Sequence, residues 1–232
     1  MRKLTFLEHL EELRLRIIKY FIFLIFVSFL VYPLVPFFIN FIIRPIKKLV
    51  FIYPTEVFST YIYIAILGGF FFSLPFLLYQ IWSFVSLALK ESEKKIVLFF
   101  GIFSFLLFIG GCSFGFFVLV PYAMRFLLSF SHPSIEPMLT LSRYISFIGF
   151  LTFSSGIVFQ FPLIIIFLSR LGIIKPNILV KKRKEAIVLA FIISAIFTPT
   201  VDIFTQTILA IPLIIFYELG IFFSKFISRD DS

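Results

Sequence analysis

The sequence predicts an all-α, polytopic membrane protein whose chain crosses the bilayer six times. Two observations support this fold class. Hydrophobic residues make up 61% of the chain and charged residues only 14%, a balance that is not found in water-soluble domains of this size. The apolar residues also gather in continuous runs, most of them as long as the roughly 20 residues that a helix needs to cross hydrocarbon.

Six apolar runs are the predicted spans, and together they form one membrane domain over residues 1–232. The runs lie at about 17–38, 61–83, 96–121, 144–169, 186–199 and 207–224. The last two are the short ones. A helix over 186–199 reaches only about 21 Å, against a hydrocarbon core of about 30 Å. Such a mismatch is met by thinning of the bilayer or by association with a partner. The other reading is two helices packed behind taller neighbours.

The basic residues predict the orientation of these spans. Sixteen Lys and Arg residues fall on the side of the two termini and five on the other side, so the termini are predicted to be cytoplasmic. The equivalent side in an organelle is the stroma or matrix. The basic residues flank the spans and do not form one patch, so the net charge of +9 does not indicate a nucleic-acid partner. The chain opens without a cleavable signal or transit pattern, which favours synthesis in a bacterium or an organelle with its own genome.

Residues 1–16 are predicted to form a cytoplasmic amphipathic helix that leads into the first span. An apolar stripe recurs at helical spacing through Phe6, Leu10, Leu13 and Ile17. Glu12 stands four residues before Arg16, the spacing of a helical ion pair. The alternative is an ordinary interfacial helix with solvated charges.

The second candidate region is the first predicted cytoplasmic loop, where an aromatic cluster is followed by several closely spaced charged residues. Glu93 lies there beside Lys94 and Lys95, at a membrane surface and close to hydrocarbon. A carboxylate in that setting can bind a cationic peptide, because ion pairs strengthen where water is partly excluded. We expect Glu12 and Glu93 both to face water when no peptide is bound.

The sequence contains no pattern of an enzyme, a metal site or a cofactor site. The two histidines, His9 and His132, are predicted on opposite membrane faces, and Cys112 is the only cysteine. Within the spans, Gln160 is the one polar side chain near mid-membrane that suggests a role. Its alternative reading is an interhelical hydrogen bond, worth about 0.6 kcal/mol in a membrane.

Five ordered blocks of the sequence resemble the TatC family, the multispanning subunit of the twin-arginine protein translocase. The first block is the segment His9-Leu-Glu-Glu-Leu-Arg-Leu-Arg16, which is similar to the family's His-Leu-x-Glu-Leu-Arg-x-Arg opening. The others are Pro54–Phe58, Leu74–Trp82 with the Lys90–Lys95 loop, Phe159–Pro162, and Thr198–Pro212 followed by Tyr217–Gly220. The resemblance covers nearly the whole chain.

The resemblance implies a receptor and not an enzyme. In this family a cup-like bundle binds signal peptides that carry two adjacent arginines and recruits single-span TatA-type and, in some systems, TatB-type subunits. Folded proteins then cross the membrane, driven by the proton-motive force. A homo-oligomer within a receptor complex is expected, in contact with lipid. The membrane is a bacterial plasma membrane or, for an organelle-encoded protein, the thylakoid or mitochondrial inner membrane.

The family's functional positions map onto ten residues of this sequence. Glu12, Arg14, Arg16 and Glu93, with Phe84 in the same loop region as Glu93, match the signal-peptide site. Pro45 and Glu56 match positions on the far side of the membrane, and Gln160, Asp202 and Gln206 match positions in the partner-facing groove.

Two functions from other classes compete with this reading. A small-solute transporter or channel would show several converging polar residues within the spans, and this chain offers essentially Gln160 alone. An assembly subunit of a respiratory or photosynthetic complex fits the composition. It leaves the acidic N-terminal helix and the Glu93 loop without a purpose.

Overall fold

The computed structural model describes residues 6–43, 49–86, 94–130, 138–170, 172–174, 176–200 and 202–229. Within these ranges the chain is helical apart from short turns and one isolated bridge between Val50 and Thr140. This confirms the all-α class. The chain divides into two compact units. The N-terminal unit comprises residues 1–105 and 138–146, and the C-terminal unit comprises residues 106–137 and 147–232.

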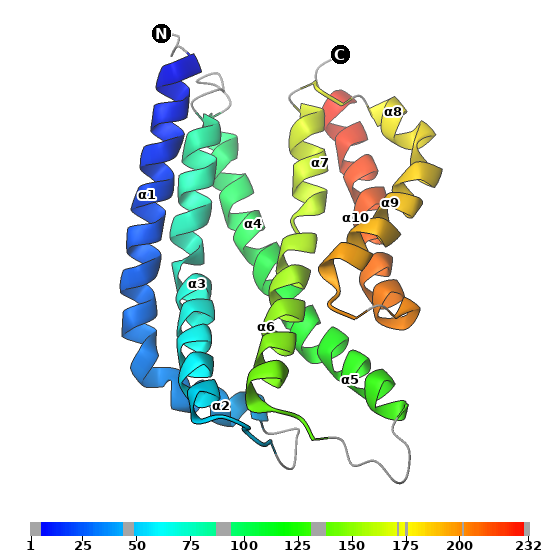
Figure 1. Cartoon of the computed structure of the whole chain (residues 1–232). Helices are drawn as coiled ribbons and strands as arrows, with labels where there is room; N and C mark the ends of the chain where they lie inside the picture. Colours follow the sequence, from blue (N-terminus) through cyan, green and yellow to red (C-terminus); the bar gives the residue numbers. More distant parts are fainter. Residues whose placement is uncertain are drawn as a thin grey trace. The chain divides into compact units, whose positions relative to one another are not determined.

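The N-terminal unit is built on two long helices, α1 (Phe6–Val31) and α3 (Pro54–Ser86), which lie side by side (Figure 1). Between them the chain passes through a 3-10 turn, η1 (Tyr32–Leu34), into α2 (Val35–Ile43). The turn has a proline in its first positions, where the fixed φ and the missing N–H end the preceding helix. The unit also contains the first part of α4 (Lys94–Phe114) and the start of α6 (Leu141–Val158).

Small residues let α1 and α3 approach closely. A Cβ on Gly69 would stand 2.1 Å from Oγ of Ser28, and one on Gly68 would stand 2.8 Å from the side chain of Val31. In a membrane such close backbone approach supplies much of the attraction between helices. Phe23 and Phe76 extend the same contact, with ring centroids 4.6 Å apart.

The C-terminal unit holds the remaining helices. The end of α4 continues through a π-helical segment, η3 (Gly115–Leu119), into α5 (Val120–Ser129). The end of α6 is followed by α7 (Phe161–Arg170), α8 (Pro176–Lys181), α9 (Arg183–Phe197) and α10 (Ile203–Arg229). α10 packs against α7 and α9.

Three glycines allow the end of α4 to meet α6. A Cβ on Gly111 would lie 2.7 Å from the carbonyl oxygen of Ser155, and one on Gly115 would lie 2.9 Å from atoms of Thr152 and Ser155. The fit is reciprocal, because a Cβ on Gly156 would lie 2.6 Å from Sγ of Cys112. The buried core of this unit therefore depends on the absence of side chains at three positions.

Five helices or helix pairs are long and apolar enough to cross a membrane within the described ranges. They are Glu8–Ile43, Pro54–Val85, Phe99–Ser129, Leu141–Arg170 and Ile203–Ser224. The expected fifth span corresponds to α9, which has 15 residues and spans only about 22 Å. The count of six spans, the orientation of the termini and the cup-like shape remain predictions.

The helix of the predicted sixth span is longer than its apolar run. α10 has 27 residues and begins at Ile203, four residues before the apolar run predicted its start. The reason is local. Asp202 caps the helix, because its Oδ1 accepts a hydrogen bond of 2.6 Å from the Thr205 N–H. The polar residues after it therefore lie inside the helix and not in a loop.

The N-terminal segment is also not a separate surface helix, since α1 runs without a break from Phe6 to Val31. Of the predicted apolar stripe, Leu10 and Ile17 are each 46% exposed. Leu13 is partly buried, so the stripe is uncovered at two of its positions, as expected for a helix face that meets lipid or a partner.

Candidate functional site

The candidate signal-peptide site begins with an ion pair on α1. Arg16 contacts a single oxygen of Glu12, donating from Nε at 2.8 Å and from Nη2 at 2.7 Å to Oε1. The pair has the helical i, i+4 spacing that the sequence predicted. Oε2 of Glu12 has no partner among the described residues, so half of the carboxylate can still accept a donor from outside.

Helix α3 holds the arginine of this pair from the other side. Arg16 donates from Nη1 to Oε1 of Gln80, at 3.1 Å. Its side chain is only 14% exposed, whereas that of Glu12 is 37% exposed. Glu12 thus remains partly exposed to water, as expected, while it is held in the predicted ion pair. The carboxylate is held by an arginine that α3 orients through Gln80.

An aromatic contact lies one turn beyond this cluster. The rings of His9 on α1 and Phe84 on α3 stack with centroids 4.3 Å apart and planes inclined by 25°. Phe84 belongs to the last helical turn of α3, and not to the loop where we expected it. The stack connects the tip of α1 to the end of α3, three residues before Glu12 on α1.

Two members of the predicted signal-peptide site have a different outcome. Arg14 is exposed and makes no ion pair within the described part of the chain. Glu93 lies outside the described residues, so its proximity to Glu12 stays a prediction. Sequence reasoning did not assign roles to His9 and Gln80. His9 is the first residue of the first sequence block that resembles the family, and Gln80 lies in the third of these blocks, Leu74–Trp82.

At the end of the N-terminal unit that is predicted to face the far side of the membrane, Glu56 connects two segments that are distant in sequence. Its Oε2 accepts the Ile52 N–H at 3.0 Å and its Oε1 accepts the Ser142 N–H at 3.1 Å. The second of these is a free donor at the start of α6, where a negative charge is favourable. Glu56 thus fixes the loop before α3 against the start of α6. Pro45 lies outside the described residues.

Gln160 interrupts the helical pair α6 and α7. The backbone turns there, with the Gln160 N–H donating to the carbonyl of Ile157 at 2.9 Å. The Ile164 N–H returns to the carbonyl of Gln160 at 3.1 Å, which starts the next helix. Pro162 in the first turn of α7 fits this start, because a proline there lacks only a donor that would be unpaired anyway.

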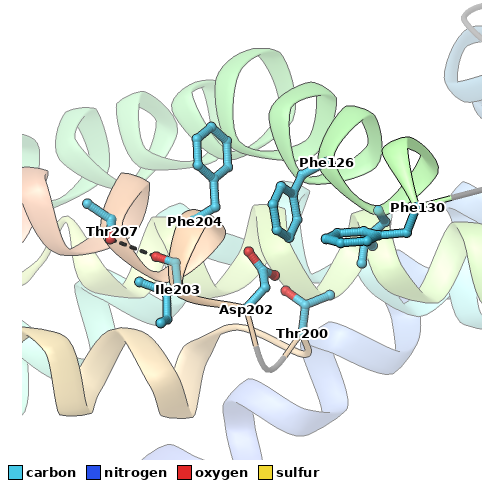
Figure 2. A pocket seen from close by; sticks show the side chains of 8 residues that line it. Phe126, Phe130, Thr200, Asp202, Ile203, Phe204 and Thr207 are labelled. Carbon is cyan, nitrogen blue, oxygen red and sulfur yellow. Dashed lines mark hydrogen bonds between the residues drawn. The ribbon is translucent and has the colours of Figure 1, made fainter.

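Asp202 lies in an open pocket of about 760 Å³ in the C-terminal unit (Figure 2). The pocket is lined by Phe126, Leu127, Phe130, Thr200, Asp202, Ile203, Phe204 and Thr207. Asp202 Oδ2 and Thr200 Oγ1 are buried atoms with no hydrogen-bond partner among the described residues. Gln206, the other predicted groove residue, lies one turn along α10, where its N–H donates to the carbonyl of Asp202 at 3.2 Å.

The described residues contain no group of three or more His, Cys, Asp and Glu side chains that could hold a metal ion. Charged side chains on the unit's predicted cytoplasmic end pair with one another, as in the contact of 2.8 Å between Arg183 and Glu218.

Known proteins resemble this chain over almost its full length. The family model for TatC, the Sec-independent protein translocase protein, matches residues 8–212. TatC of Carboxydothermus hydrogenoformans is 40% identical over 97% of this chain and 95% of its own length. TatC of Aquifex aeolicus is 36% identical over 96% of this chain and 95% of its own length.

A solved structure agrees with these matches. The crystal structure of the twin-arginine translocase receptor TatC superimposes with a TM-score of 0.82 at 35% identity, covering 95% of this chain and all of the other. The chain therefore belongs to the TatC family: it is a multi-pass membrane subunit of the Sec-independent, twin-arginine protein translocase, and not an enzyme.

Proposed function

We propose that the paired ends of α1 and α3 bind the two arginines of a signal peptide, with Glu12 and Glu93 as the receiving carboxylates. The observation that carries the proposal is the clamped carboxylate of Glu12, with Oε1 held by Arg16 and Oε2 left open. A guanidinium presents donors in a planar fork that matches a carboxylate. An incoming arginine can therefore bind Oε2 without displacing Arg16.

Arg16 acts here as a positioning residue. Its two contacts to Oε1 and its hydrogen bond to Gln80 restrict the rotation of the Glu12 side chain. A carboxylate that is already held loses less conformational entropy when it binds a ligand. The stack of His9 and Phe84 places apolar ring surface on the same two helices, and a charge-assisted contact is stronger where water is partly excluded.

The translocase complex of this chain contains other Tat subunits, and we infer that they include single-span TatA-type and TatB-type helices and further copies of the chain. The short helix α9 supports this inference, because a helix of about 22 Å leaves a mismatch that a partner can cover. The energy source is the proton-motive force of a bacterial plasma membrane or its organellar counterpart. A solute-transport role lacks support from any described contact.

The test is binding of synthetic signal peptides to the purified protein in nanodiscs. A peptide with two adjacent arginines should bind at least about tenfold more tightly than one with two lysines, because a planar guanidinium can direct two N–H groups at the open oxygen, as Arg16 does at Oε1, and an ammonium group cannot. Equal affinity of the two peptides contradicts the proposal.

A further inference from the structure

The pocket around Asp202 combines an apolar wall with an unpaired acidic oxygen. Phe126 and Phe204 stack with centroids 5.2 Å apart and planes inclined by 13°, and Phe130 meets Phe126 edge-on at 5.0 Å. In Figure 2 the carboxylate of Asp202 points toward the Phe126 and Phe204 rings, and the hydroxyl of Thr200 points toward that carboxylate. Acid and rings therefore line one opening.

The two oxygens of Asp202 have different tasks. Oδ1 caps α10 through the Thr205 N–H. Oδ2 is buried and has no partner among the described residues, and the same holds for Oγ1 of Thr200. An acceptor that is removed from water without a donor is costly, and the cost is larger for a charged acceptor. A donor that also carries positive charge would satisfy both oxygens.

We propose that this pocket takes a basic side chain of a protein partner, with lysine as the simplest case. An ammonium group supplies three donors and no acceptor, which suits the two orphaned oxygens. Its positive charge is attracted to the faces of aromatic rings, as in other aromatic cages. The apolar stem of the side chain packs against phenylalanine, because long basic side chains bury their methylene groups readily.

The lining argues for a protein and against a phospholipid. A headgroup amine always brings a phosphate with it, and none of the described residues that line the pocket carries a positive charge to receive that phosphate. A basic side chain brings only its cation. The volume of about 760 Å³ also lies within the range of about 300–1,000 Å³ that is typical of ligand pockets.

The inference deepens the proposed recruitment of partner subunits and rests on it, since it names the chemistry of the group that Asp202 receives. The test uses the whole protein with 4-fluorophenylalanine at position 204, in nanodiscs of phosphatidylglycerol, which has no amine. Two probes are titrated while the fluorine resonance is followed. They are N-acetyl-lysine methylamide and N-acetyl-norleucine methylamide, which share a stem and differ in the charge.

The lysine probe should bind about tenfold more tightly than the norleucine probe, a difference that corresponds to about 1.4 kcal/mol. Asp202→Asn should reduce the ratio to about one while the helix cap is kept, because Asn is as good a cap as Asp. Phe126→Leu should reduce the ratio in part. Glu218→Gln, which removes a carboxylate elsewhere in the same unit, should leave the ratio unchanged.

Equal binding of the two probes, or a preference that survives Asp202→Asn, overturns the inference. A fluorine shift caused by phosphatidylethanolamine in place of the lysine probe, and lost in Asp202→Asn, assigns the pocket to lipid and overturns it too. Twin-arginine peptide affinity is measured on the same samples. If the wild-type protein shows no lysine preference but binds the twin-arginine peptide, this inference alone is refuted and the signal-peptide proposal stands.

Discussion

Arg16 holds Glu12 by a single carboxylate oxygen, through Nε at 2.8 Å and Nη2 at 2.7 Å. The contact leaves the second oxygen of Glu12 without a partner among the described residues. It also ties the carboxylate to α3, because the same guanidinium donates to Gln80. A surface ion pair of this spacing contributes only about 0.3–0.5 kcal/mol to stability, so its importance lies in orientation.

The first prediction concerns Glu12. Replacing it by Gln removes the charge-assisted contact to an incoming arginine, which should cost roughly 1.5–3 kcal/mol of binding free energy. Twin-arginine peptide affinity, measured by titration in nanodiscs, should fall by about ten- to a hundredfold. Glu11→Gln is the matched control, since Glu11 is the exposed neighbour on the same helix. A similar loss in both variants points to general surface charge and not to a site.

The second prediction concerns Glu93. Glu93→Gln should lower the affinity for the twin-arginine peptide by a similar factor, since the second arginine loses its carboxylate. Raising the salt concentration should weaken wild-type binding, because partly exposed pairs are screened. The double variant with Glu12→Gln should then bind twin-arginine and twin-lysine peptides alike. Wild-type affinity in Glu93→Gln removes this residue from the site.

A third prediction separates the positioning role of Arg16 from direct binding. Gln80→Leu removes the hydrogen bond that orients Arg16 and leaves every charge in place. Peptide affinity should fall about three- to tenfold, because the bond to Gln80 acts on the peptide only through the position of Arg16 and Glu12. The salt dependence should stay that of the wild type, because no charge is lost. A changed salt slope would show that Gln80 acts in another way.

The fourth prediction tests the glycine contact between α4 and α6. Gly111→Ala places a Cβ 2.7 Å from the carbonyl oxygen of Ser155, so the midpoint of thermal unfolding in detergent should fall. The chain supplies its own control in the adjacent glycine. A Cβ on Gly110 meets no atom within 4 Å, so Gly110→Ala should leave the midpoint unchanged or slightly raised. Equal behaviour of the two variants contradicts the packing described above.

The fifth prediction concerns α9. Its short length and its exposed apolar side chains favour docking of a single-span subunit. A photocrosslinker at Ile192, which is 52% exposed, should capture such a subunit in membranes that contain the whole translocase. The reference position is Ile25 on α1, which is 68% exposed and is expected to meet lipid. Capture at position 25 and none at position 192 refutes docking at α9.

The sequence by itself determined the class of the protein and the interactions that lie within one helix. Continuous apolar runs predicted long helices, because no other continuous segment satisfies its backbone hydrogen bonds in hydrocarbon. The spacing of Glu12 and Arg16 predicted their ion pair, because four residues make slightly more than one helical turn. The ordered motifs also identified the family, which the matches to known TatC proteins confirmed.

Only the tertiary structure decided which distant residues meet. Arg16 and Gln80 are 64 positions apart, and Glu56 and Ser142 are 86 positions apart. Their contacts depend on the register between neighbouring helices. Hydrophobic periodicity does not determine that register, because a shift of one helix along the other changes the buried apolar area only a little. Close contacts such as that of Gly69 with Ser28 fix this register, because only a glycine leaves room for the facing residue. Which residue faces a given glycine is known only after the helices have packed.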